Sequence, residues 1–219
     1  MHLNFTPFIP SIPYILQGIL VTLQIVVVAA ILGLILGTLL SLCKISSVKI
    51  LGWFAKAYTS VFRGTPMVLQ LMIIYFGSPE ILGYQIAPYT AAILSFGLNS
   101  GAYVSEIIRA GILAVDKGQR EAALALGIPY GKMMWDIILP QALKNILPAI
   151  MNELITLTKE SAIVTTIGVM DVMRRAYQVG SDNYSFFEPL LIAGGIYYLM
   201  VIILSFFGRL LEGRMRRSD

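Results

Sequence analysis

The stretch that decides the fold is residues 116–140, DKGQREAALALGIPYGKMMWDIILP. It is a charged segment between long apolar runs, so we expect it to lie in water while its neighbours lie in lipid. Asp116 can accept hydrogen bonds from the backbone amides that open a helix, and Gln119 can complete a capping box. Gly127 favours the end of a helix. These signals predict a helix over about 117–126, roughly 15 Å long.

The composition indicates a membrane protein. Of the 219 residues, 57% are hydrophobic and 13% are charged, whereas a soluble domain typically has about 25% charged residues. The net charge of +4 is expected for a multi-pass membrane protein, whose cytoplasmic loops are rich in Lys and Arg. We therefore expect membrane lipid, and no nucleic acid, around this chain. Cys43 is the only cysteine and His2 the only histidine, so we expect no metal site.

Apolar runs separated by charged or turn residues predict an all-α membrane protein with one domain, residues 1–219. The five predicted transmembrane helices cover about 14–42, 53–76, 89–108, 133–158 and 186–207. Each provides about the 20 residues that a bilayer crossing needs. With the N-terminus outside and the C-terminus in the cytoplasm, 13 of the 16 basic residues lie on or near the cytoplasmic side, as the positive-inside rule requires. The arginines from Arg209 to Arg217 then anchor the last span on that side.

The segment between the fourth and fifth predicted spans does not fit a simple crossing. Lys159 and Glu160 interrupt the apolar pattern, and residues 161–172 are only 12 long before Arg174 follows. That is too short to cross a hydrocarbon core of about 30 Å. Irregular backbone at membrane depth is tolerated only where protein or a cavity covers it, so we expect a re-entrant or broken helix here.

Polar side chains in the third and fourth predicted spans form two stripes. The third span carries Ser95, Asn99, Tyr103 and Glu106, with Ser100 beside Asn99, and the fourth carries Asn145, Asn152, Glu153, Thr156, Lys159 and Glu160. Their spacing places most members of each set on one helical face. An ionisable group inside a span costs about 2.5 to 3.5 kcal/mol, so each one requires a reason.

Two interpretations of these stripes are open. The carboxylates and the lysine of the fourth span can form a structural ion pair or triad, and the polar residues of the third span can hydrogen-bond between helices. Alternatively, a polar solute binds to Asn99, Ser100, Tyr103, Glu153, Lys159 and Glu160. Two carboxylates with one lysine suit a solute that combines an ammonium or guanidinium with a carboxylate. That solute is an amino acid, and the excess of acid over base favours a cationic one.

Seven residues of the stretch 116–140 stand at fixed offsets: Glu121, Ala122, Ala123, Gly127, Ile137, Leu139 and Pro140. This pattern resembles the EAA loop of the membrane subunits of bacterial ABC importers. The resemblance implies a cytoplasmic coupling helix that docks in a cleft of a separate ATP-hydrolysing subunit. The small side chains of Ala122 and Ala123 would let that subunit come close. An ordinary amphipathic helix lying on the membrane surface is the alternative.

Three further stretches carry charged or polar groups within the apolar runs. They are Arg63-Gly64-Thr65-Pro66 with Gln70, Asn99-Ser100-Gly101-Ala102-Tyr103 with Glu106-Ile107-Ile108-Arg109, and Lys159-Glu160-Ser161. They resemble the signature stretches of the polar amino acid permeases among the ABC importers. The resemblance implies a bacterial inner-membrane complex with two ATP-binding subunits, a second permease subunit that forms a homodimer with this one, and an extracytoplasmic solute-binding protein. Glu160-Ser161 replaces the Asp-Thr or Asp-Ser pair usual in that family, which leaves the amino acid open.

The absence of a nucleotide-binding motif narrows the functions that this chain can have. A P-loop has four residues between its glycines and then Lys followed by Ser or Thr, but only three residues separate Gly127 from Gly131, and Met133 follows Lys132. We therefore expect ATP and Mg²⁺ to bind a partner subunit, with no cofactor in this chain.

We also expect no enzyme activity in this chain. The only candidate acid pair inside the membrane, Glu153 and Glu160, is separated by two helical turns, about 10 Å. The sequence predicts a permease subunit that imports a polar amino acid. A passive channel or pore subunit for a small polar solute is the alternative.

Overall fold

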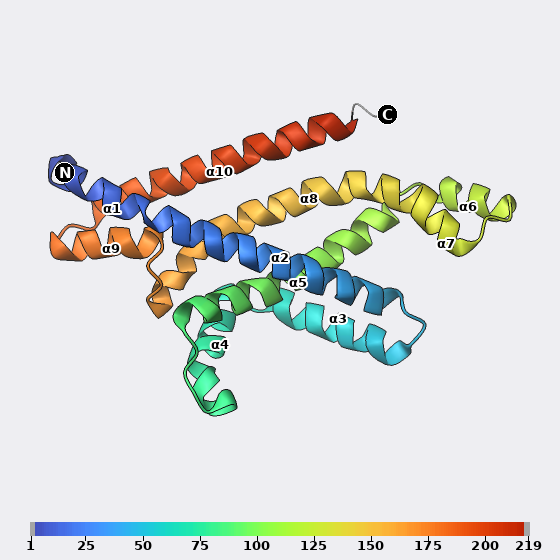
Figure 1. Cartoon of the computed structure of the whole chain (residues 1–219), viewed down its shortest axis with the longest axis horizontal. Helices are drawn as coiled ribbons and strands as arrows, with labels where there is room; N and C mark the ends of the chain where they lie inside the picture. Colours follow the sequence, from blue (N-terminus) through green and yellow to red (C-terminus); the bar gives the residue numbers. More distant parts are fainter. Residues whose placement is uncertain (1–2, 217–219) are drawn as a thin grey trace.

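The computed structural model describes residues 3–216, and the elements in this range are all helical (Figure 1). In chain order they are η1 (Thr6–Ser11), α1 (Ile12–Leu16), α2 (Gly18–Ile45), α3 (Lys49–Gly64), α4 (Met67–Leu82), α5 (Pro88–Leu113), α6 (Lys117–Ala125), α7 (Tyr130–Lys132), the π-helical η2 (Met133–Ile138), α8 (Leu139–Glu160), the 3₁₀-helical η3 (Ser161–Ile167), α9 (Val172–Asp182) and α10 (Phe187–Arg216). The predicted all-α class is confirmed. His2 and Arg217, which the sequence singled out, lie outside the described residues.

The long helices share one general direction. Figure 1 shows α2, α8 and α10 extended along the long axis, with α6 and α7 at one end of the molecule and α1 and α9 at the other. We call these the α6 end and the α9 end. The length of the bundle therefore separates the α6 region from the N-terminal helix α1.

Three stretches of helix in the described residues are long and apolar enough to cross a membrane. They are Thr6–Ile45, Pro88–Leu113 and Phe187–Met215, which contain the predicted first and third spans and nearly all of the fifth. The helix α8 covers most of the predicted fourth span, but its polar stripe keeps it outside this apolar group.

The predicted second span, 53–76, is two helices rather than one. Between α3 and α4 the chain bends by 105°, and Thr65 is extended there, with φ −122° and ψ 148°. Pro66 causes the break, because proline lacks an amide hydrogen and disfavours helical backbone in the residue before it. The single span predicted over 53–76 is therefore corrected to two helices that meet at Pro66.

The helices α2 and α5 pack against each other along much of their length. A Cβ atom added to Gly33 of α2 would lie 2.7 Å from the Ser100 side chain, and one added to Gly97 of α5 would lie 2.4 Å from that of Leu32. Only glycine permits backbones to approach so closely, a device common between membrane helices. We call α2 and α5 the tight pair.

An ion pair joins the two helices of the tight pair near the α6 end. Lys44 Nζ lies 2.6 Å from Glu106 Oε1, and the Lys44 side chain is only 5% exposed. Arg109 lies 2.8 Å from the second oxygen of Glu106. Both carboxylate oxygens therefore have a cationic partner, as a charge withdrawn from water requires.

A broken helical segment follows α8, in agreement with the prediction for residues 161–172. The backbone tightens into η3, turns at Gly168 with φ +83°, and begins α9 after Asp171. Asp171 is fully buried; its carboxylate accepts hydrogen bonds from the Arg174 amide and the Tyr197 hydroxyl, each at 2.8 Å. These bonds fix the start of α9 against α10.

Candidate functional site

The loop between α5 and α8 begins with the predicted helix. α6 spans Lys117–Ala125, and Asp116 Oδ1 accepts a hydrogen bond of 2.8 Å from the Gly118 amide, as an N-cap residue does. Gln119 departs from the expected capping box, because its Oε1 accepts a hydrogen bond of 3.3 Å from Gln141 of α8. That contact ties α6 to α8.

The end of α6 depends on Gly127. The Gly127 amide donates to the Leu124 carbonyl and the Ile128 amide donates to the Ala123 carbonyl, both at 3.0 Å. This pair of bonds is the Schellman motif, which needs left-handed backbone at its glycine. Gly127 has that backbone, with φ +69°. The sequence therefore predicted both ends of this helix to within one residue.

Six residues of the EAA-like pattern, all except Leu139, are the ones that the sequence predicts to contact an ATP-hydrolysing subunit, and they do not all face outward. Glu121, Ala122, Gly127 and Pro140 are exposed, whereas Ala123 is buried and Ile137 is half-buried. Ala123 and Ile137 pack in an apolar cluster with Met133 and Ile138. The small side chain of Ala123 therefore permits close contact within this chain. It holds α6 against η2 and α8.

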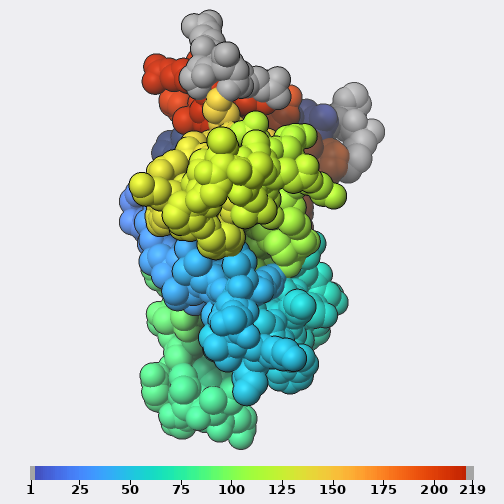
Figure 2. All heavy atoms as spheres, turned by 90° about the vertical axis from the view of Figure 1, so that its right-hand side faces the viewer, coloured from blue at the N-terminus to red at the C-terminus, as the bar shows by residue number. Residues whose placement is uncertain are grey.

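Large apolar side chains beside α6, which the sequence did not mark as functional, are exposed. Leu126 is 78% exposed and Trp135 is 73% exposed, and Tyr130 lies exposed between them in the chain. Trp135 belongs to the π-helical stretch η2, a type of helix frequent at functional sites. Figure 2 views the molecule from the α6 end and shows this loop as its projecting face, next to the residues that join α2 and α3. The aromatic residues within this otherwise charged loop were the sequence signal that could have revealed the exposed apolar surface.

Asn99 lies at the bend between α3 and α4. It is buried, and its Nδ2 donates to Gln70 Oε1 at 2.9 Å and to the Phe62 carbonyl at 3.1 Å. Gln70 Nε2 donates to the same carbonyl at 2.8 Å and to Thr65 Oγ1 at 2.8 Å. These bonds satisfy the Phe62 carbonyl, which has no helical hydrogen-bond donor because the helix breaks there. Asn99 therefore supports the bend.

Tyr103 lies on α5, one helical turn after Asn99, and is partly exposed. The guanidinium carbon of Arg63 lies 5.3 Å from the centre of the Tyr103 ring, within the range of a cation–π contact. The arginine of α3 and the aromatic ring of α5 thus form one amphipathic surface. Arg63 has a partner within the protein.

No hydrogen bond between Ser100 and Glu153 joins the two predicted polar stripes, because Ser100 is buried against Gly33 of α2 and its hydroxyl has no hydrogen-bond partner among the described residues. Glu153 and Glu160 are half-buried and lie two helical turns apart on α8. Lys159, next to Glu160 in the chain, is exposed. Among residues 3–216, no ion pair within 4.0 Å includes Glu153, Lys159 or Glu160. Within one chain, these charges therefore do not form the locking triad that was one of the two interpretations.

These features define a multi-pass membrane protein with charged groups inside its helical bundle and a capped helical loop at one end. A family model described as "Binding-protein-dependent transport system inner membrane component" matches residues 29–217. The chain belongs to this family, which confirms the resemblance to the membrane subunits of ABC importers.

Relatives match over almost the whole chain. The arginine transport system permease protein ArtQ of Bacillus subtilis (strain 168) is 64% identical over 219 residues, which cover 100% of both chains. The putative glutamine transport system permease protein GlnP of Rickettsia felis is 53% identical over 208 residues, 95% of each chain. A solved structure described as an amino acid ABC transporter with histidines is 42% identical, with a TM-score of 0.94 over 98% of this chain and 100% of that one.

Proposed function

We propose that this chain is a permease subunit of an ATP-driven amino acid importer in a bacterial inner membrane. The observation that carries the proposal is the set of three ionisable side chains on α8, half-buried Glu153 and Glu160 with exposed Lys159, in a helix that we place in the membrane. A charged solute that leaves water needs charged partners, because neutral hydrogen bonds offset only part of the cost. The relatives' names refer to arginine, glutamine and amino acid transport, which supports an amino acid as the solute.

The imported solute is a cationic amino acid. Such a molecule has two positive groups and one carboxylate, which complement two glutamates and one lysine without an unmatched charge. Tyr103 supplies an aromatic ring at the adjacent helix α5, whereas Ser100, which the sequence also predicted to touch the solute, is buried against Gly33 of α2. Asn99, whose amide is committed to Gln70 and the Phe62 carbonyl, supports this site through the bend rather than by touching the solute.

The helix α6 is the coupling helix on the cytoplasmic side. It docks in an ATP-hydrolysing subunit through its exposed residues Glu121 and Ala122 and through Gly127 just after its end, with the exposed apolar side chains of Leu126 and Trp135 beside them. Two such subunits bind ATP and Mg²⁺, one beneath each copy of this chain in a homodimer. A solute-binding protein delivers the amino acid at the α9 end, outside the cell.

This assembly implies five spans, with the N-terminus outside and the C-terminus in the cytoplasm. The bent helices α3 and α4 count as one broken span, and α8 counts as a polar span that lines the route. Broken helices beside a central site are common in transporters.

The helix α8 connects the motor contact to the solute site. Closure of the ATP-hydrolysing subunits pushes α6, which holds α8 through the Gln119–Gln141 hydrogen bond and the apolar cluster around Ala123. Glu153 lies farther along the same helix, so a movement of α8 reaches the solute directly. Access to the site alternates as the helices rock around it.

The substitution Glu153→Gln tests the solute site. In proteoliposomes that contain the complete complex and its binding protein, we expect uptake of L-arginine to fall at least about ten-fold, because one charge-assisted contact worth about 1.4 kcal/mol or more is lost. Glu153→Asp, which retains the charge, should lose less. Copurification with the ATP-hydrolysing subunit should be unchanged.

Two results would contradict the proposal. Equal loss of uptake and of assembly in Glu153→Gln would assign the carboxylate to structure alone. Solute flux at full rate without ATP would assign the chain to a passive pore.

A further inference from the structure

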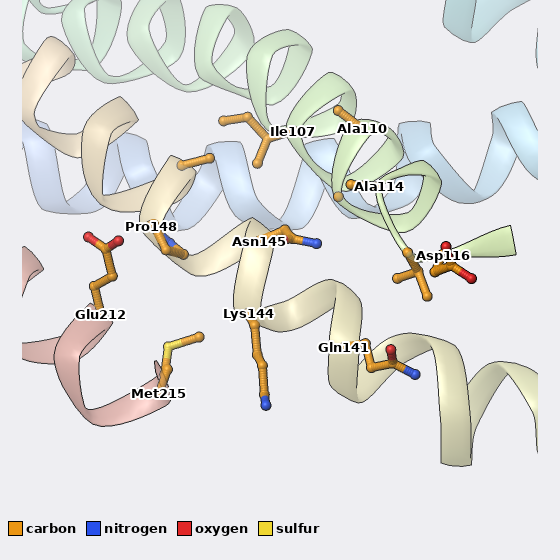
Figure 3. A pocket seen from close by; sticks show the side chains of 13 residues that line it. Ile107, Ala110, Ala114, Asp116, Gln141, Lys144, Asn145, Pro148, Glu212 and Met215 are labelled. Carbon is orange, nitrogen blue, oxygen red and sulfur yellow. The ribbon is translucent and has the colours of Figure 1, made fainter. Parts of the chain in front are cut away.

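A recess of about 130 Å³ lies between α8 and α10. It adjoins a larger cavity of about 730 Å³ near the α6 end, because Pro148 of α8 and Glu212 of α10 line both. Figure 3 looks into the larger cavity and shows these two residues on their separate helices. The residues that line only the smaller recess include Asn152 of α8 and Ser205, Gly208 and Arg209 of α10. No function described so far uses this recess.

The polar side chains of the recess can receive an anion. No hydrogen bond or ion pair within residues 3–216 engages the side chain of Asn152, Ser205 or Arg209, and Arg209 is exposed. Glu212 already has a partner, so it is not counted among these groups. A guanidinium, an amide and a hydroxyl all donate hydrogen bonds, and the guanidinium adds a permanent positive charge. This combination suits a phosphate.

The recess lies where α10 leaves the membrane in the proposed topology. The stretch Phe187–Met215 is apolar enough to cross a bilayer, and the predicted fifth span ends at about residue 207. Arg209 follows within one helical turn, so its guanidinium reaches the level of the phosphates of the cytoplasmic leaflet. Ser205 is four residues nearer to the centre of the bilayer, about 6 Å along the helix.

An apolar surface continues from the recess toward the centre of the bilayer. Ile202 and Tyr198 precede Ser205 by three and seven residues, so they lie on the same face of α10. They are 43% and 69% exposed. From the α6 end inward, this face therefore presents a cation, then hydrogen-bond donors, then apolar surface. A phospholipid has the matching order of an anionic phosphate, glycerol and ester oxygens, and acyl chains.

We propose that this recess binds one anionic glycerophospholipid of the cytoplasmic leaflet. The lipid phosphate pairs with Arg209, and an acyl chain lies along Ile202. The glycerol and ester oxygens accept hydrogen bonds from Ser205 and Asn152. The lipid thus joins α10 to α8, the helix that carries Glu153. The proposal rests on the proposed topology but not on the identity of the solute.

A second copy of this chain is the other molecule that could cover this face of α10. A protein surface, however, gives no reason for a cation, hydrogen-bond donors and apolar surface in the order of a lipid. Anionic lipids are also attracted to basic residues at the cytoplasmic surface of a membrane. These two arguments favour the lipid.

The test measures lipid binding to the complete complex by native mass spectrometry. The complex is delipidated in detergent and titrated with dioleoyl phosphatidylglycerol. We expect one tightly bound lipid per copy of this chain, and Arg209→Gln should raise its half-saturating concentration about ten-fold, because one charge-assisted contact is lost. Arg214→Gln is the matched control. It removes another exposed arginine of α10, which does not line the recess, so its lipid binding should equal that of the native complex.

Gly208→Leu tests the recess without a change of charge. A Cβ added to Gly208 would lie 3.6 Å from the Met151 side chain, so the larger side chain of leucine fills the recess. We expect a loss of lipid affinity of about ten-fold here too. Gly213→Leu is the control, because a Cβ added to Gly213 meets nothing within 4 Å and this glycine does not line the recess. An unchanged midpoint of thermal unfolding shows that each variant is folded.

Two further ligands separate the possible occupants. Dioleoyl phosphatidylcholine has the same acyl chains, but its choline offsets the phosphate charge, so we expect weaker binding. Glycerol 3-phosphate in large excess should not displace the lipid, because it has no acyl chain. Displacement would assign the recess to a water-soluble phosphate and overturn the proposal.

Two other results would also overturn it. Equal binding of phosphatidylglycerol by the native complex, Arg209→Gln and Gly208→Leu would place the lipid elsewhere. Loss of the second permease subunit in Arg209→Gln would assign this face to the contact between two copies. Lipid binding is measured without solute or ATP, so failure of the proposed import leaves the result unaffected.

Discussion

The tight pair and the polar arm, which we define as residues 117–167, are held together by different means. The tight pair consists of regular helices that touch at glycines and are joined by the buried ion pair of Lys44 and Glu106. The polar arm passes through the left-handed Gly127, a π-helical stretch and a 3₁₀-helical stretch. Regular helices that pack closely are held in a single arrangement. Irregular backbone, in contrast, is frequent at functional sites. We therefore expect substitutions in the tight pair to affect assembly and substitutions in the polar arm to affect transport.

The largest effect on assembly should come from Glu106→Ala. It leaves the ammonium of Lys44 buried without a carboxylate, which costs about 3 kcal/mol or more. We expect a lower midpoint of thermal unfolding and a lower yield of monodisperse complex.

Arg109→Ala is the control for Glu106→Ala. The Arg109 side chain is 49% exposed, and an exposed ion pair contributes less than about 1 kcal/mol. A thermal midpoint that Glu106→Ala leaves unchanged would show that the ion pair does not hold the tight pair together.

A smaller loss should follow from Gly97→Leu, which places a side chain where Leu32 already lies. Overpacking of this kind costs about 1 to 3 kcal/mol, and the same thermal measurement detects it. Gly194→Leu in α10 is the matched control, because a Cβ added there meets nothing within 4 Å. Equal stability of the two variants would mean that α2 and α5 separate easily.

Local signals explain what the sequence predicted well. The ends of α6 follow from Asp116 and Gly127, whose hydrogen bonds reach no more than five residues along the chain. The first, third and fifth spans follow from apolar runs long enough to cross a bilayer. The charged group at Glu153, Lys159 and Glu160 was visible because ionisable residues are rare in such runs.

Contacts between distant residues explain what the sequence did not reveal. The bend between α3 and α4 is stabilised by Asn99 and Gln70, which are 29 residues apart. Glycines at 33 and 97 are plain in the sequence, but nothing there indicates that their helices face each other. The burial of Ala123 likewise depends on how α6 folds back on η2 and α8. Each of these features needs a partner whose position only the tertiary structure provides.

The smallest effect on stability should come from Gly127→Ala in the polar arm, with Gly131→Ala as the matched control. A Cβ added at either glycine meets nothing within 4 Å, but only Gly127 has a positive φ. The pair therefore isolates backbone strain, about 1 to 2 kcal/mol for an L-residue in left-handed backbone. Both glycines are exposed, Gly127 in the turn after α6 and Gly131 within the short helix α7, so both variants should assemble normally.

Relief of that strain displaces the end of α6, and a coupling contact weakened by about 1 kcal/mol is populated about five-fold less. We expect the uptake of L-arginine per ATP hydrolysed to fall several-fold in Gly127→Ala and to stay unchanged in Gly131→Ala. Measuring both rates in the same proteoliposomes gives this ratio. If the two variants have equal ratios, the left-handed end of α6 is needed only for folding. The proposed difference between the tight pair and the polar arm would then fail at α6, where the ATP-hydrolysing subunit is proposed to dock.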